Sequence, residues 1–182
     1  MPSRKLLVTI HLYLAAVFTP MILLMALTGT LYLFGIKGKT EYTVVQTLQI
    51  PKTQLNRAGD NLNGDISGVL QQAGIEFEFE YIKVKGNKFY TRPTSRDHYL
   101  LVQKGNRVEI SKGTPDFLAA MVELHKGHGP VLFKWLEKIF GICLVLISLS
   151  GFLLGLLSPV FKTKTLALSG VGLVLVVVAA IL

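Results

Sequence analysis

Long apolar runs alternate with one polar region along the chain. Leu6–Ile36, Ile139–Phe161 and Thr165–Leu182 contain no Asp, Glu, Lys or Arg. A helix needs roughly 20 mostly apolar residues to cross the ~30 Å hydrocarbon core of a bilayer. The first two runs exceed that length, and the third is near its lower limit. We therefore predict three membrane-spanning helices, with the lipid bilayer as their solvent.

The polar region between the first two runs has the length of one small domain. We expect four parts: an N-terminal tail with the first span (1–36), the domain (37–131), the second span (132–161), and a short connector with the third span (162–182). The predicted fold class is thus membrane α-helical with a small α+β domain that contains an antiparallel sheet.

Alternating apolar and polar positions predict the strands of this domain. The strand-like runs are 41–50, 76–85, 88–93, 97–103 and 107–111. Lys85-Gly86-Asn87 and Lys104-Gly105-Asn106 each separate two such runs, so each is expected to turn a hairpin. The last four runs therefore form an antiparallel meander.

The first of those four runs changes its parity. Phe77 and Phe79 share one parity, whereas Ile82 and Val84 take the other. A slip by one residue sends side chains to the opposite face of a sheet. The pattern therefore predicts a bulge or strong twist near Tyr81–Ile82.

Two short helices are predicted from their end signals. Asp65 is the expected N-cap of a helix that Gly74 ends. Thr114, with Pro115 at the first helical position, predicts the start of a second helix that runs to His125. Glycines and a proline follow it and separate it from the second span.

The net charge of +8 does not indicate a nucleic-acid partner, because the basic residues outside the domain flank the spans. These are Arg4 and Lys5 in the tail, and Lys162 and Lys164 in the connector. Lys and Arg in short flanks mark the cytoplasmic side. We therefore expect the domain and the C-terminus in the periplasm, with the chain in a bacterial inner membrane. Cys143 is the only cysteine, so no disulfide forms within one chain.

The sequence lacks a Gly-rich phosphate loop, a CxxC pair, an HExxH motif and a nucleophile elbow. Four histidines remain. His11, inside the first span, is either a haem or metal ligand or a hydrogen-bonding group of the helix. His125 and His128 are open to metal or haem binding, to pH sensing, or to a structural role. His98, on a predicted strand, is expected at the surface.

Gly151 and Gly155 form a G-x-x-x-G motif in the second span. Small residues at this spacing let helices approach closely. The motif indicates helix packing, either within the chain or between copies, unless these glycines reflect only the general frequency of glycine in membrane helices. Gly141, Thr28 and Gly29 are further residues expected in helix packing.

Two stretches together resemble the PepSY-associated transmembrane family. In the first, His11 opens a span and Thr28-Gly29 stands near its far end. In the second, Leu124-His125-Lys126-Gly127 precedes a span that contains Gly141 and Ser150-Gly151. The family's order is a histidine at the entry of a span and Thr-Gly or Ser-Gly near its end. The polar region between them is similar to a PepSY module.

Better-known relatives in that family are ferric-siderophore reductases of the inner membrane, with b-type haem on histidines of their spans. The resemblance implies His11 and His125 as the matching positions. About 22 residues separate His11 from the outer end of its span, or roughly 33 Å. One haem b therefore cannot join both histidines, and a second copy or a partner would supply the other ligand. His125 and His128 are alternatively expected to share a metal ion.

Two hypotheses follow. In the first, the chain is an accessory subunit without catalysis, whose PepSY-like module serves a membrane protein complex, self-association, or restraint of a periplasmic peptidase. In the second, it is a haem-binding electron-transfer protein similar to the siderophore reductases. The missing reaction motifs favour the first, and the two matched histidines favour the second.

Overall fold

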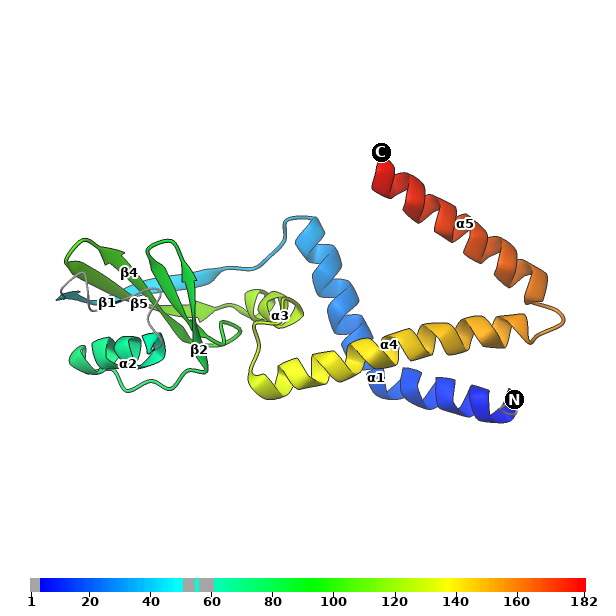
Figure 1. The fold of residues 1–182 in the computed structure, drawn as a ribbon, viewed down its shortest axis with the longest axis horizontal. Coiled ribbons are helices and arrows are strands. Elements are labelled where there is room, and N and C mark those ends of the chain that lie inside the picture. Colours follow the sequence, from blue (N-terminus) through cyan, green and yellow to red (C-terminus); the bar gives the residue numbers. More distant parts are fainter. Residues whose placement is uncertain (1–3, 51–54, 56–60) are drawn as a thin grey trace. The chain divides into compact units, whose positions relative to one another are not determined.

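The computed structural model describes residues 4–50, 55 and 61–182. The chain divides into two compact units. One takes its residues from Met1–Ile22 and Lys138–Leu182, and the other is Leu23–Glu137. The second unit contains the sheet domain, whose strands are drawn as arrows in Figure 1.

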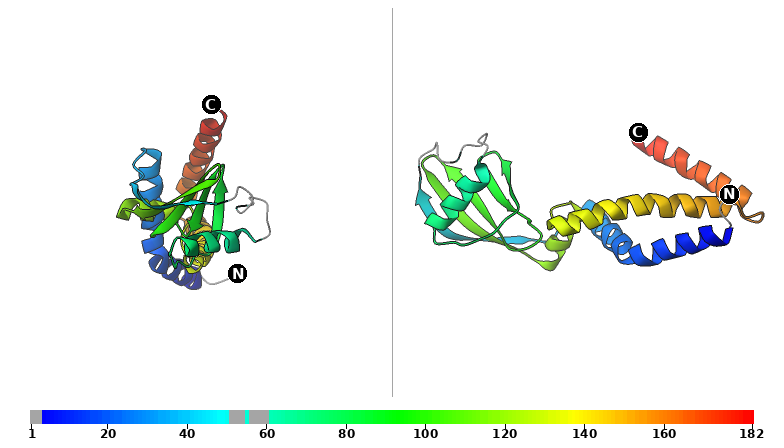
Figure 2. Two further views of the ribbon diagram at one scale, coloured as in Figure 1. Left: turned by 90° about the vertical axis from the view of Figure 1, so that its left-hand side faces the viewer. Right: turned by 60° about the horizontal axis from the view of Figure 1, so that its bottom comes forward.

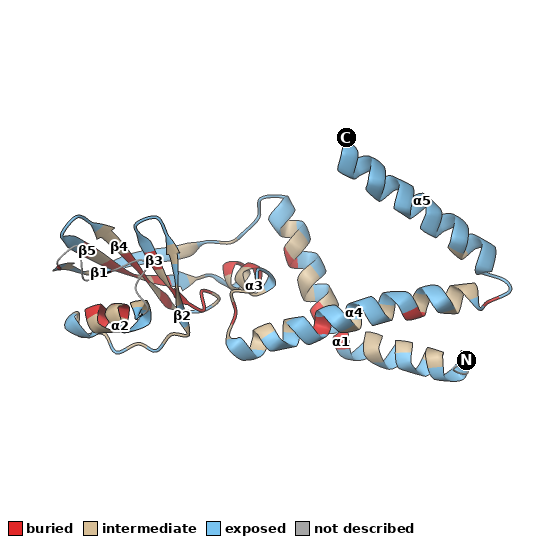
Figure 3. Ribbon diagram, viewed as in Figure 1, coloured by how far each residue is buried: buried red, intermediate tan, exposed pale blue. Residues whose placement is uncertain are grey.

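Three helices are long and apolar enough to cross a membrane: α1 (Arg4–Leu33), α4 (Val131–Leu156) and α5 (Lys162–Ile181). They coincide with the three apolar runs of the sequence, so the predicted class of membrane protein is confirmed. None of the residues of α5 is buried within the chain, and Figure 3 shows this helix as exposed along its length.

The sheet has five antiparallel strands in the order β1-β5-β4-β3-β2. Their bounds are β1 Thr40–Gln49, β2 Tyr81–Lys85, β3 Lys88–Arg92, β4 His98–Lys104 and β5 Arg107–Pro115. Strands β2 to β5 form the expected meander, and β1 joins its edge beside β5 (Figure 1). Gly86 and Gly105 both have positive φ in the predicted hairpin turns, a conformation that glycine adopts without steric cost.

Helix α2 (Leu62–Gln72) lies across one face of the sheet (Figure 2). The apolar side chains of that face and of α2 form the core of the domain. Burying their apolar surface stabilises the fold by about 25 cal/mol per Å². The buried members of this core are Ile50, Leu55, Ile66, Val69, Leu70, Phe89, Leu101, Val108 and Ile110.

The predicted N-cap of α2 is wrong by four residues. Asp65 lies inside the first turn instead of at the N-cap, which is Asn61 and makes no side-chain capping bond. An acid in the first turn still interacts favourably with the helix dipole. The predicted end is confirmed, because Gly74 follows the last turn with φ +69°.

A strand was expected over residues 76–85, but the observed strand, β2, comprises only the second half of that range. Residues 76–80 form no strand, and the expected bulge near Tyr81–Ile82 is absent because the strand begins there. The register shift lies in β1 instead, between Val44 and Gln46. The two parities thus belong to two different structures, a non-strand segment and then a strand.

Glu80, just before β2, joins this part of the chain to the start of α4. Its Oε1 accepts a hydrogen bond from the backbone N–H of Val131 at 2.7 Å, and its Oε2 lies 3.1 Å from Lys134 Nζ. Val131 is the first residue of α4. The carboxylate therefore satisfies one of the free N–H groups at the start of a helix, where negative charge is stabilising.

The predicted start of the second helix also moves. β5 continues through Pro115, which pairs with Thr40, so Thr114 is a strand residue and not the N-cap. Asp116 caps α3 (Phe117–His125) by accepting from Ala119 N at 2.7 Å. Its other oxygen accepts from Lys39 N at 2.8 Å. The cap thus also holds the chain that enters β1.

His98 is buried, with 1% of its surface exposed, so its predicted place at the surface is wrong. Its Nδ1–H donates to the Arg96 carbonyl at 2.9 Å, which leaves Nε2 to accept from the Tyr42 hydroxyl at 3.3 Å. Burial lowers the pKa of His98. The ring lies over Gly113 of the neighbouring strand, where an added Cβ would stand 2.7 Å from Nε2.

Gly113→Ala is expected to destabilise the protein by about 1–3 kcal/mol, because the new methyl group overpacks against a buried ring that hydrogen bonds hold in place. Thermal unfolding of the detergent-solubilised chain measures this. Gly68→Ala in α2 is the control, since an added Cβ there meets no atom within 4 Å and alanine favours a helix. Equal unfolding temperatures for the two variants would contradict the packing of His98 on Gly113.

Candidate functional site

His11 of α1 contacts the Ser150-Gly151 pair of α4. The imidazole Nδ1 lies 2.9 Å from Ser150 Oγ. The Ser150 hydroxyl donates its own proton to the Ile147 carbonyl at 2.9 Å. With that proton committed, Ser150 Oγ accepts from His11, so Nδ1 carries the hydrogen. Nε2 of the neutral ring then keeps its lone pair.

His125, the last residue of α3, makes the same kind of contact with the Thr28-Gly29 pair of α1. Its Nδ1 lies 3.2 Å from Thr28 Oγ1. The Thr28 hydroxyl donates to the Leu24 carbonyl at 2.6 Å, so it too accepts from the imidazole. Nε2 of His125 is therefore left with its lone pair in the neutral ring.

The glycine of each pair leaves room for the ring. A Cβ at Gly151 would lie 3.2 Å from Cε1 of His11, and a Cβ at Gly29 would lie 3.1 Å from Cε1 of His125. Both distances are shorter than ordinary van der Waals contact. The two His and hydroxyl-Gly motifs of the sequence are thus reciprocal: the histidine of each stretch lies on the Thr-Gly or Ser-Gly pair of the other.

Both rings have the form of a possible haem or metal ligand. A ligating histidine usually donates its second ring N–H to a neighbouring group, which fixes the ring and its tautomer. His11 and His125 each do so at Nδ1 and present Nε2. Each offers a single ligand, because no group of three or more His, Cys, Asp or Glu side chains able to hold a metal occurs in residues 4–50, 55 and 61–182.

His128 belongs to a separate network around Glu123. Glu123 Oε2 lies 2.7 Å from His128 Nδ1 and 3.3 Å from Arg92 Nη1, and it accepts from the Thr94 hydroxyl at 2.5 Å. The other oxygen of Glu123 lies 2.5 Å from Lys126 Nζ. His128 is therefore engaged with a carboxylate, and nothing in the network joins it to His125.

Two opposing effects act on the Glu123 carboxyl. Burial raises its pKa, but hydrogen bonds from Lys126, Thr94 and His128 outweigh burial and lower the pKa to about 2. Glu123 is therefore ionised at neutral pH. Burial also lowers the pKa of His128, against the effect of the carboxylate.

Of the glycines expected in helix packing, Gly155 lies close to α5. A Cβ on it would stand 2.5 Å from Thr165 Oγ1. Gly151 receives His11, as described above, whereas an added Cβ at Gly141 meets no atom within 4 Å. Packing between copies of the chain stays a prediction.

Sequence reasoning missed Arg92, Thr94 and Glu123, which come from different elements and share no spacing. Arg92 ends β3, Thr94 lies two residues further along the chain, and Glu123 lies two residues before the end of α3. The signal in the sequence was one acidic residue, Glu123, within a predicted helix that is otherwise mostly apolar.

Ser150→Ala is expected to lower the free energy of unfolding by about 1 kcal/mol, because His11 loses its acceptor inside the membrane. Ser148→Ala is the matched control: Ser148 is on the same helix and bonds only its own backbone, at Leu144. Unfolding in mixed micelles measures both variants. Equal losses would mean that the contact between His11 and Ser150 contributes nothing specific.

Acid is expected to weaken the domain through Glu123. Its pKa is lower in the folded chain, so the stabilisation is fully present above the ordinary 4.5 and is lost as the pH falls towards about 2. Glu123→Gln removes this part of the pH dependence. Unfolding temperatures of both proteins across that window test it, and parallel curves would contradict it.

The comparisons with known proteins agree with the sequence motifs. No curated protein and no solved structure matches the chain. A family model described as "Putative PepSY_TM-like" matches residues 4–182. The match includes α1, the sheet domain, α4 and α5, and with them both histidine contacts. The chain therefore belongs to this PepSY_TM-like family of membrane proteins.

Proposed function

We propose that the chain is an accessory subunit of the bacterial inner membrane, which holds its PepSY-like sheet domain in the periplasm for a partner in a membrane complex. The observation that carries this proposal is the attachment of the sheet domain at both of its ends. Asp116 fixes the chain that enters β1, and Glu80 fixes the start of α4. Hydrogen-bonded chain connections of this kind are more restrained than a flexible linker, which suits a module that is presented to a partner.

The third span supports a partner within the membrane. α5 buries none of its residues in the chain, so its surface is left to lipid or to another helix. Lys162 and Lys164 at its start favour a cytoplasmic connector, and with Arg4 and Lys5 they favour a periplasmic sheet domain.

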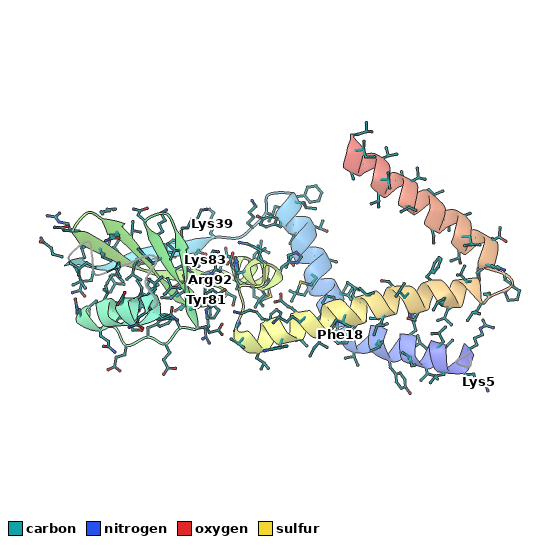
Figure 4. The ribbon with its side chains drawn as sticks, viewed as in Figure 1. Lys5, Phe18, Lys39, Tyr81, Lys83 and Arg92 are labelled. Carbon is teal, nitrogen blue, oxygen red and sulfur yellow. The ribbon has the colours of Figure 1, made fainter. Side chains whose placement is uncertain are left out.

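A photo-cross-linking amino acid at Val174 of α5 is expected to capture another membrane protein in intact cells. The same amino acid at Phe18 is the control, because that ring is buried 5.8 Å from the ring of Phe140 and should react only within the chain. Phe18 is labelled in Figure 4. Identification of one protein from the Val174 sample alone supports the proposal. A chain that remains alone in both samples would contradict it.

A second candidate function, haem-dependent electron transfer, is favoured by the Nε2 lone pairs of His11 and His125. Haem iron held by such nitrogens accepts and releases single electrons. The residues of this chain would supply one ligand per haem and fix each ring through Ser150 or Thr28.

Protein produced with ample haem decides this second candidate by its absorption spectrum. A Soret band that His11→Ala or His125→Ala reduces, while His128→Ala leaves it unchanged, would support haem binding. A wild-type spectrum without a Soret band would exclude it.

A further inference from the structure

A cavity of about 380 Å³ lies on the sheet domain, and residues from strands β1 to β4 and from α3 line it. Phe89 and Val84 face the core under α2. Because side chains alternate along a strand, their neighbours Lys83, Tyr90 and Arg92 point to the opposite face. Lys83 and Tyr90 are direct partners in the ladder between β2 and β3. Figure 4 labels Lys83 and Arg92 near one another.

The lining of this cavity is strongly cationic. It includes Lys83, Lys85, Arg92 and Lys126, and its only carboxylate is Glu123. Four cations and one carboxylate leave a surplus of three positive charges. A cavity with one sign of charge and low-dielectric walls concentrates ions of the opposite sign. Its volume is in the range of small-ligand sites.

Arg92 provides the second, independent observation. The residue is 8% exposed, and its Nε is buried without a hydrogen-bonding partner in the part of the chain that the structure describes. Buried guanidinium N–H groups are nearly always paired. Only Nη1 is engaged by Thr94 and Glu123. The arginine therefore retains capacity for an acceptor, and its planar donors suit phosphate oxygens.

The cavity also adjoins the end of a span. Glu123 and Lys126 line it, and between them His125 contacts Thr28 inside α1. Thr28 is five residues from Leu33, where α1 ends. The cationic lining is thus near the boundary of lipid and water, where each Lys or Arg contributes about 1 kcal/mol towards anionic lipid.

We propose that this cavity binds a phosphate-bearing anion, with an anionic phospholipid headgroup as the source that its position favours. Arg92 and Lys126 hold the phosphate, and Lys83 and Lys85 attract it. Glu123 keeps Arg92 and Lys126 in place through its two oxygens. This site requires neither a partner protein nor haem, so it stands apart from the proposed function.

Native mass spectrometry of the full chain in neutral detergent tests the proposal with phosphatidylglycerol and phosphatidylcholine as probes. Wild-type protein is expected to retain phosphatidylglycerol and not phosphatidylcholine. The Lys83→Gln/Lys85→Gln variant is expected to bind it at least about tenfold more weakly. The matched control is Lys88→Gln/Arg107→Gln, which removes the same charge from exposed positions outside the cavity.

Inorganic phosphate in the same titration separates the two sources. Retention of phosphatidylglycerol that phosphate cannot displace identifies the lipid headgroup. Displacement by phosphate, or binding of phosphate alone, identifies a soluble phosphate ligand for the same site. Equal weakening in both double variants, or unchanged binding of both probes in Lys83→Gln/Lys85→Gln, would overturn the proposal.

Discussion

A hydrogen bond between an imidazole and a hydroxyl, made over a glycine, is the interaction on which the membrane part of this protein depends. Hydrocarbon offers no water, so polar groups there need protein partners. Ser150 and Thr28 give their protons to their own helices and become acceptors for His11 and His125. The glycine beside each hydroxyl makes the approach of the ring possible.

The sheet domain is built onto the ends of these helices by the same principle of satisfied polar groups. Glu80 accepts a hydrogen bond from the backbone N–H of Val131, and Asp116 accepts from the backbone N–H groups of Ala119 and Lys39. Each carboxylate serves a helix start and a chain connection at once. The contact of His125 with Thr28 brings the end of α3, and with it Lys126 of the cationic cavity, near the end of α1.

Local sequence patterns predicted what local physics determines. The lengths of the apolar runs predicted the three spans. Gly86 and Gly105 predicted the two hairpins, because their positive φ angles are ones that glycine adopts without strain. The errors lie where a distant partner decides. Asp116 replaced Thr114 as the cap because β1 extends β5 to Pro115. His98 is buried because Gly113, on the next strand, leaves space for its ring. The motif positions of His11 and His125 were evident, but their hydroxyl partners required the packed helices.

The tautomers of the two histidines test the central claim most directly. Nitrogen-15 spectra of imidazole-labelled protein, at a pH where the rings are neutral, distinguish a protonated Nδ1 from a protonated Nε2, and His11→Ala and His125→Ala assign the signals. The account predicts that both rings carry the hydrogen on Nδ1, because Ser150 and Thr28 have no proton left to donate. Hydrogen on Nε2 in either ring would contradict it.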